Sequence, residues 1–78
     1  MSNLPADFTP DLLAADIARL IQRRRTELGM SQEELALASG VGRRFINELE
    51  GGKPNARLGL TLMVLASLGI RISAKGPS

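Results

Sequence analysis

The sequence predicts an all-α domain of four to five short helices, followed by one short β-strand near the C-terminus. Three observations lead to this fold class. Apolar residues recur at helical spacing along most of the chain. Glycine and proline residues interrupt that pattern where helices are expected to end. The chain has 78 residues and no cysteine, so it can form one compact domain with a thin core and no disulfides.

The first helix is expected over residues 10–28, after a leader of residues 1–8 that carries little periodic signal. It should begin at the Thr9-Pro10 pair, because a threonine oxygen can cap the first turn and the fixed φ of proline suits that turn. Gly29 is placed to end it. We therefore expect a flexible leader and an ordered domain that begins at Thr9.

Two shorter helices follow. The stretch SQEE predicts a capping box, in which the Ser31 oxygen accepts from the amide of Glu34 and the Glu34 carboxylate accepts from the amide of Ser31. The helix that starts there should end at Gly40. The next helix, RRFINELE, should begin near Gly42 and end at Gly51, because glycine breaks the pattern there.

A fourth helix and a strand complete the predicted order of elements. Asn55 is placed to cap this helix and Gly69 to close it. Residues 70–73 read IRIS, and this strict alternation of apolar and polar residues predicts a strand. The expected domain therefore covers residues 9–69, and residues 70–78 form the C-terminal strand and tail.

The composition argues against an enzyme. Histidine and cysteine are absent, which removes the usual general base, nucleophile and zinc ligands, and the eight carboxylates are scattered along the expected helices. We expect no catalytic residue, no metal and no cofactor. No apolar run approaches the roughly 18 residues that cross a bilayer, and the N-terminus lacks the pattern of a signal peptide. A soluble, cytoplasmic chain with no membrane partner is therefore expected.

Charge is unevenly distributed along the chain, although the net charge is only +2. Acidic residues dominate residues 1–18, and basic residues then predominate up to Arg57. Arg43 and Arg44 stand in the first turn of the third helix, where the helix dipole disfavours each cation by about 0.3–1 kcal/mol. The two arginines are either an ordinary solvated pair or the binding site of an anionic partner.

The second and third helices have the spacing of a DNA-binding unit. Two helices joined by a tight turn that contains glycine form the helix-turn-helix, whose second helix enters the major groove. Ala36 must be small because the helices cross beside it, and Gly40 supplies the freedom of φ that the turn needs. Ile46 and Leu49 anchor the second helix of the unit to the core, and Gln32 opens the first.

Over residues 20–69 the chain resembles the XRE family, the Cro and phage-repressor type of helix-turn-helix. The matching stretches are SQEELALASGV, RRFINELEGGKP and LASLG. The resemblance implies a compact phage-repressor-like domain that binds double-stranded DNA. It places the following residues at base edges: Arg43, Arg44 and Asn47. It places the following near the DNA backbone: Gln32, Ser31, Lys53 and Arg57. The chemistry agrees, because arginine matches guanine, asparagine matches adenine, and a helix N-terminus attracts phosphate.

Other residues near this unit have structural interpretations. The resemblance implies an ion pair between Arg25 and Glu50. Arg24 lies on the apolar stripe of the first helix, so its stem is expected to pack while its head reaches water. Two roles remain open for Phe45, contact with a thymine methyl group or packing beside Leu49.

The C-terminal part predicts a homodimer. One side of the fourth helix is expected to face the core and carries Leu58, Thr61, Leu62, Leu65 and Leu68. Leu60 and Met63 lie on the other side, and a helix that is apolar nearly all round is usually buried on both sides. The strand at 70–73 has no partner strand in the chain, and an isolated strand is unstable. We expect two copies to pair these strands, with Leu60, Met63, Ile70 and Ile72 at the interface.

This arrangement, with a first helix opened by Thr-Pro, resembles the HipB-like antitoxins. The resemblance implies a repressor of its own operon that binds a palindromic operator and a HipA-like kinase toxin. Two alternatives stay open: a stand-alone XRE-type regulator, and a protein-interaction module that keeps the fold without reading DNA. Arg43, Arg44 and Gln32 argue against the second, because such a module has no need of positive charge at a helix N-terminus.

Overall fold

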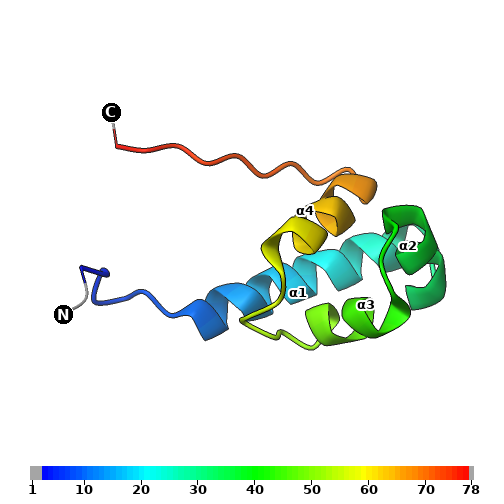
Figure 1. Cartoon of the computed structure of the whole chain (residues 1–78), viewed down its shortest axis with the longest axis horizontal. Helices are drawn as coiled ribbons and strands as arrows, with labels where there is room; N and C mark the ends of the chain where they lie inside the picture. The colour runs from blue at the N-terminus through cyan, green and yellow to red at the C-terminus, as the bar shows by residue number, and fades with distance from the viewer. Residues whose placement is uncertain (1–2, 78) are drawn as a thin grey trace.

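The computed structural model describes residues 3–77, which contain four α-helices (Figure 1). In chain order these are α1 (Pro10–Glu27), α2 (Gln32–Ser39), α3 (Arg43–Glu50) and α4 (Leu58–Ser67). The predicted all-α class is confirmed, and the bounds of α1, α2 and α3 agree with those expected to within about one residue. Residues 1–2 of the expected leader and residue 78 of the tail lie outside the described part.

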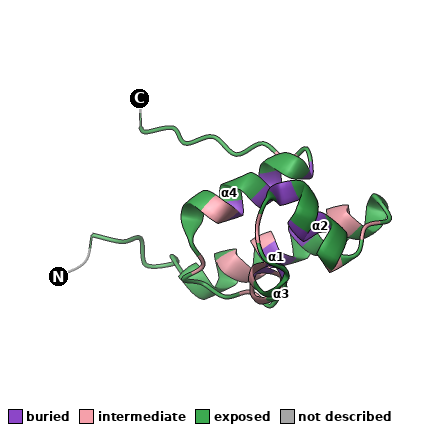
Figure 2. Cartoon of the chain, turned by 45° about the vertical axis from the view of Figure 1, so that its right-hand side comes forward, coloured by how far each residue is buried: buried purple, intermediate pink, exposed green. Residues whose placement is uncertain are grey.

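The core draws on all four helices. Its largest fully buried side chains are Ile21, Leu35, Ile46, Val64, Leu65 and Leu68. Burying a side chain of this size stabilises a fold by about 1.5–3 kcal/mol. Helix α2 packs against α3 and α4, and α1 packs against α3. The buried residues lie on the faces that the helices turn toward one another (Figure 2).

The first helix begins differently from the prediction. Thr9 has extended backbone angles, but its side chain makes no capping hydrogen bond, so the predicted threonine cap is wrong. Pro10 stands at the first helical position, where its fixed φ is sufficient to start the helix. At the other end Gly29 has a φ of +70°, as expected for a glycine that stops a helix.

The capping box at the start of α2 is confirmed. The amide of Glu34 donates to Ser31 Oγ at 3.0 Å, and the amide of Ser31 donates to Glu34 Oε1 at 2.8 Å. The following turn is also as expected. Gly40 has a φ of +73°, and the amide of Val41 donates to the carbonyl of Ala36 at 3.0 Å. The start and end of α2 are therefore set by local sequence.

We expect Ser31→Ala to lower the free energy of unfolding by about 1 kcal/mol, because the amide of Glu34 loses its acceptor. Urea unfolding followed by circular dichroism would measure the change. Thr9→Ala is the matched control, since Thr9 precedes a helix without capping it. Equal effects of the two substitutions would show that the Ser31 cap does not stabilise α2.

The predicted start of α4 is wrong. The helix begins at Leu58 with Arg57 as its N-cap residue, so Asn55 does not cap it. The hydroxyl of Thr61 donates to the carbonyl of Arg57 at 2.8 Å. The face expected to meet the core is confirmed in part, because Thr61, Leu65 and Leu68 are buried. Leu58 and Leu62 are exposed instead of buried, while Val64 is buried.

The predicted strand is not formed in the described chain. Residues 70–77 leave the end of α4 without regular secondary structure and run back toward the side of the molecule where the N-terminus lies (Figure 1). A strand is stabilised by hydrogen bonds to a neighbouring strand, and none of the described residues forms one. Ile70 still packs against the core, and Ile72 is exposed. The single chain, over its described residues, supplies no partner for this strand, and the pairing of two copies stays a prediction.

Candidate nucleic-acid interface

Helix α3 is held by one face and exposes the other. Ile46 and Leu49 are buried in the core, as the spacing predicted. On the outer face the side chain of Arg43 is 64% exposed and that of Arg44 is 92% exposed. Asn47 is also exposed. The three residues expected at base edges therefore lie along one solvent-facing side of a rigidly packed helix.

The two arginines make only weak contacts within the chain. Arg43 Nε lies 3.9 Å from Glu33 Oε1, and Arg44 Nε lies 3.7 Å from Glu48 Oε2. Exposed ion pairs of this kind contribute about 0–1 kcal/mol. The first turn of α3 contains no acid and no side-chain cap. Both guanidinium groups can therefore turn toward an external anion at little cost.

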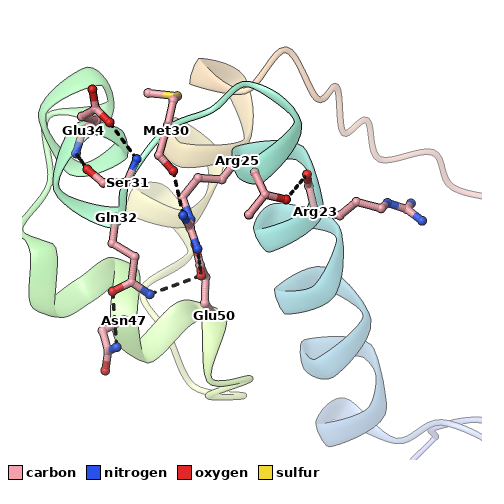
Figure 3. Close-up of polar contacts among 9 residues, drawn as sticks. Arg23, Arg25, Met30, Ser31, Gln32, Glu34, Asn47 and Glu50 are labelled. Atoms are coloured by element: carbon pink, nitrogen blue, oxygen red, sulfur yellow. Dashed lines mark hydrogen bonds and ion pairs between the residues drawn. The ribbon is translucent and has the colours of Figure 1, made fainter.

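A chain of hydrogen bonds joins the start of α2 to α3 (Figure 3). The side-chain nitrogen Nδ2 of Asn47 donates to Gln32 Oε1 at 3.4 Å. The side-chain nitrogen Nε2 of Gln32 donates to Glu50 Oε1 at 3.2 Å. Gln32 is thus oriented by partners on both sides, and it lies next to Asn47 on the same surface. A residue expected at the DNA backbone and one expected at a base edge therefore lie side by side, joined by one long hydrogen bond.

The ion pair between Arg25 and Glu50 is present. Arg25 Nε donates to Glu50 Oε2 at 2.7 Å, and Arg25 Nη2 donates to Glu50 Oε1 at 3.0 Å. The side chains are only 12% and 5% exposed. The hydrogen bond to Glu50 raises the pKa of Arg25 above its usual value, and burial partly opposes this rise. Arg25 also donates to the carbonyl of Met30 at 2.7 Å, so the pair ties α1 to the end of α3 and the start of α2.

The remaining residues expected near DNA lie before α2 or after α3 in the chain. Ser31 uses its hydroxyl in the capping box, at the N-terminus of α2. Lys53 follows α3, and its Nζ lies 3.5 Å from Glu48 Oε1. Arg57 is exposed before α4. Ser31, Lys53 and Arg57 therefore come from the start of α2 and from the segment that follows α3, not from α3 itself.

The sequence interpretation was incomplete for Arg24 and for Glu48. The Arg24 side chain is 42% exposed, as expected, but its Nε also donates to the carbonyl of Leu68 at 2.9 Å and so caps the end of α4. Glu48 contacts two cations of the surface and was not singled out. Its spacing of four residues from Arg44 was the available signal. Phe45 is half-buried and packs against the core, which favours the packing role.

A helix that is anchored by its apolar face, exposes two arginines in its first turn and is preceded by a capped helix and a glycine turn defines a helix-turn-helix domain. Residues 21–73 match the helix-turn-helix family model. The chain is also 48% identical, over 63 residues, to y4mF of Sinorhizobium fredii (strain NBRC 101917 / NGR234), an uncharacterized HTH-type transcriptional regulator. That match covers 81% of this chain and 83% of the relative. The chain belongs to the XRE-type helix-turn-helix family of transcription regulators. No helix in the described residues is long and apolar enough to cross a membrane.

Proposed function

We propose that this protein binds a specific double-stranded DNA site and represses transcription from it. The observation that carries the proposal is the outer face of α3, where Arg43 and Arg44 are largely exposed and Asn47 is held by Gln32. Arginine can bind guanine through O6 and N7, and asparagine can bind adenine through N6 and N7. A helix that presents both residue types from a fixed core can read a short base sequence.

The flanking residues are proposed to position this helix on the DNA. Gln32 and Ser31 stand where the N-terminus of α2 can approach a phosphate. Lys53 and Arg57 extend the positive charge beyond the end of α3. Contacts of this kind set the register and carry the salt dependence of binding, while base contacts carry its specificity.

The alternative, a protein-interaction module that does not read DNA, is less well supported. Such a module has no use for two exposed arginines in a first turn that contains no acid. In vitro selection from a library of random duplexes tests the proposal. We expect enrichment of one sequence that contains guanine. A pool that stays random after repeated selection would contradict sequence-specific binding.

We further propose that the protein binds as a homodimer. Apolar residues near the C-terminal end are left exposed or half-exposed in the single chain: Leu60, Leu62, Met63, Ile70 and Ile72. Antiparallel pairing of residues 70–73 with the same residues of a second copy would cover the isoleucines and supply the missing backbone partners. The selected site would then be an inverted repeat with half-sites about one DNA turn, roughly 34 Å, apart.

Truncation after Gly69 should reduce dimerisation and leave the helices largely intact. Because Ile70 packs against the core, Ile72→Ser is the sharper variant, since Ile72 is 54% exposed. Light scattering would report size, and circular dichroism would report helicity. Truncation after Ala74 is the matched control and should remain dimeric. A full-length chain that is monomeric at micromolar concentrations would contradict the proposed dimer.

We also propose that the regulator acts as a HipB-like antitoxin. The support is narrower here. The resemblance depended on two features, the Thr-Pro start of the first helix and the strand at residues 70–73. Helix α1 does begin at the Thr-Pro pair, whereas the strand is absent from the described single chain. Co-expression with a HipA-like kinase encoded beside the gene tests the proposal. Joint purification of the two chains would support it, and separate elution from a neighbouring kinase would contradict it.

A further inference from the structure

Glu48 is the one acid on α3 that lies close to two cations of the DNA-facing surface. Its Oε2 lies 3.7 Å from Arg44 Nε, and its Oε1 lies 3.5 Å from Lys53 Nζ. The chain also turns back over it, because the amide of Lys53 donates to the carbonyl of Glu48 at 3.3 Å. The carboxylate therefore sits between a residue proposed to read a base and a residue proposed to bind the backbone.

The position of Glu48 is better defined than that of the other acid at this surface. Glu33 lies 3.9 Å from Arg43, and its side chain is 75% exposed. The side chain of Glu48 is 37% exposed and has two partners. Glu48 lies four residues, about one helical turn, after Arg44, so the two side chains stand on the same side of α3.

A carboxylate in this position would oppose binding to DNA of unrelated sequence. Sequence-independent binding comes from cations that neutralise phosphates and release counterions. A carboxylate beside Arg44 and Lys53 removes part of their positive charge and repels an approaching phosphate. On a matching site, by contrast, the carboxylate can accept a hydrogen bond from a cytosine amino group while Arg44 turns to the neighbouring base.

We propose that Glu48 is a specificity-determining residue: it weakens binding to unrelated DNA more than binding to the matching site. The inference rests on the proposed function, because it assumes that α3 meets DNA. It assigns Glu48 a role that Arg44 and Lys53 do not share. Those two residues increase affinity, whereas Glu48 increases the difference in affinity between the two kinds of DNA.

The test compares Glu48→Gln with Glu27→Gln in the full chain. Both variants raise the formal net charge by one from +2. Glu27 is a matched control because it also lies 3.7 Å from an arginine, Arg24, but belongs to α1 and lies outside the α2–α3 unit. Fluorescence anisotropy would measure binding to the in vitro selected duplex and to a duplex of the same composition with scrambled order. Circular dichroism melts would verify that both variants are folded.

We expect Glu48→Gln to bind the scrambled duplex about fivefold more tightly, as the loss of one nearby charge in water implies. The dependence of log K on log salt should become steeper by up to about one unit. Binding to the selected duplex should change less, and Glu27→Gln should change both affinities less than about twofold. The ratio of the two affinities therefore falls only for Glu48→Gln.

Two results would overturn the inference. Equal effects of Glu48→Gln and Glu27→Gln on the scrambled duplex would mean that only net charge matters. A loss of affinity of Glu48→Gln for both duplexes would mean that Glu48 keeps the side chains of Arg44 and Lys53 in position for binding. A wild-type chain that selects no sequence contradicts the proposed function instead, and the comparison on scrambled DNA still decides whether Glu48 opposes unselective binding.

Discussion

Replacing Glu50 with alanine should lower the free energy of unfolding by roughly 3–5 kcal/mol, since it leaves a nearly buried guanidinium without its carboxylate. Arg25 is only 12% exposed and makes two hydrogen bonds to Glu50. Arg25→Ala should have a comparable effect, because the Glu50 carboxylate, 5% exposed, then loses its cation. For a chain of 78 residues a loss of this size is a large part of the total stability.

Chemical denaturation of the variants would measure these losses. Glu27→Ala is the matched control, because the pair between Arg24 and Glu27 is 42% and 56% exposed. Removing that surface pair should cost about 0–1 kcal/mol. The double variant Arg25→Met with Glu50→Leu should recover much of the loss, since no charge is then left buried. Equal stabilities for Glu50→Ala and Glu27→Ala would contradict a structural role for the buried pair.

The second large effect is expected on DNA binding. Arg43→Ala and Arg44→Ala should each weaken binding to the selected duplex by about 1–3 kcal/mol and relax its sequence preference. Both side chains are exposed and lightly paired, so their removal should leave the fold unchanged. Anisotropy titrations with the selected and scrambled duplexes would separate the loss of specific contacts from the loss of charge.

Lys53→Ala provides the contrast for these two variants. Lys53 is proposed to contact the DNA backbone beyond the end of α3, so it should contribute similarly to the affinity for both duplexes. Its removal should lower the slope of log K against log salt concentration by about one unit. The arginine variants should instead lower the affinity for the selected duplex more. If all three variants lost the same affinity on both duplexes, the arginines would contribute charge and would not read bases.

The features that the sequence predicted well depend on neighbouring residues. The capping box needs only Ser31 and Glu34, which are three positions apart. The turn at Gly40 needs one residue with positive φ. The buried positions Ile46 and Leu49 follow from helical spacing. Patterns formed by residues a few positions apart can be recognised in one sequence without a structure. Such patterns located the α2–α3 unit.

The features that were missed depend on contacts between distant segments. Arg24 caps the end of α4 through the carbonyl of Leu68, which lies 44 positions away. The burial of Val64, and the exposure of Leu62, depend on how α4 rotates against α2. Local capping chemistry was also misleading at Asn55, because the loop before α4 continues to Arg57. The alternation at residues 70–73 is compatible with a strand but supplies no partner for one.

Whether the outer face of α3 reads a DNA sequence is decided by the ratio of two dissociation constants. Dissociation constants of the wild-type chain would be measured for the selected duplex and for its scrambled counterpart at the same salt concentration, near physiological ionic strength. We expect the selected duplex to bind at least roughly 1,000-fold more tightly, in the range of specific DNA-binding proteins. Equal dissociation constants for the two duplexes would show that α3 does not read a sequence.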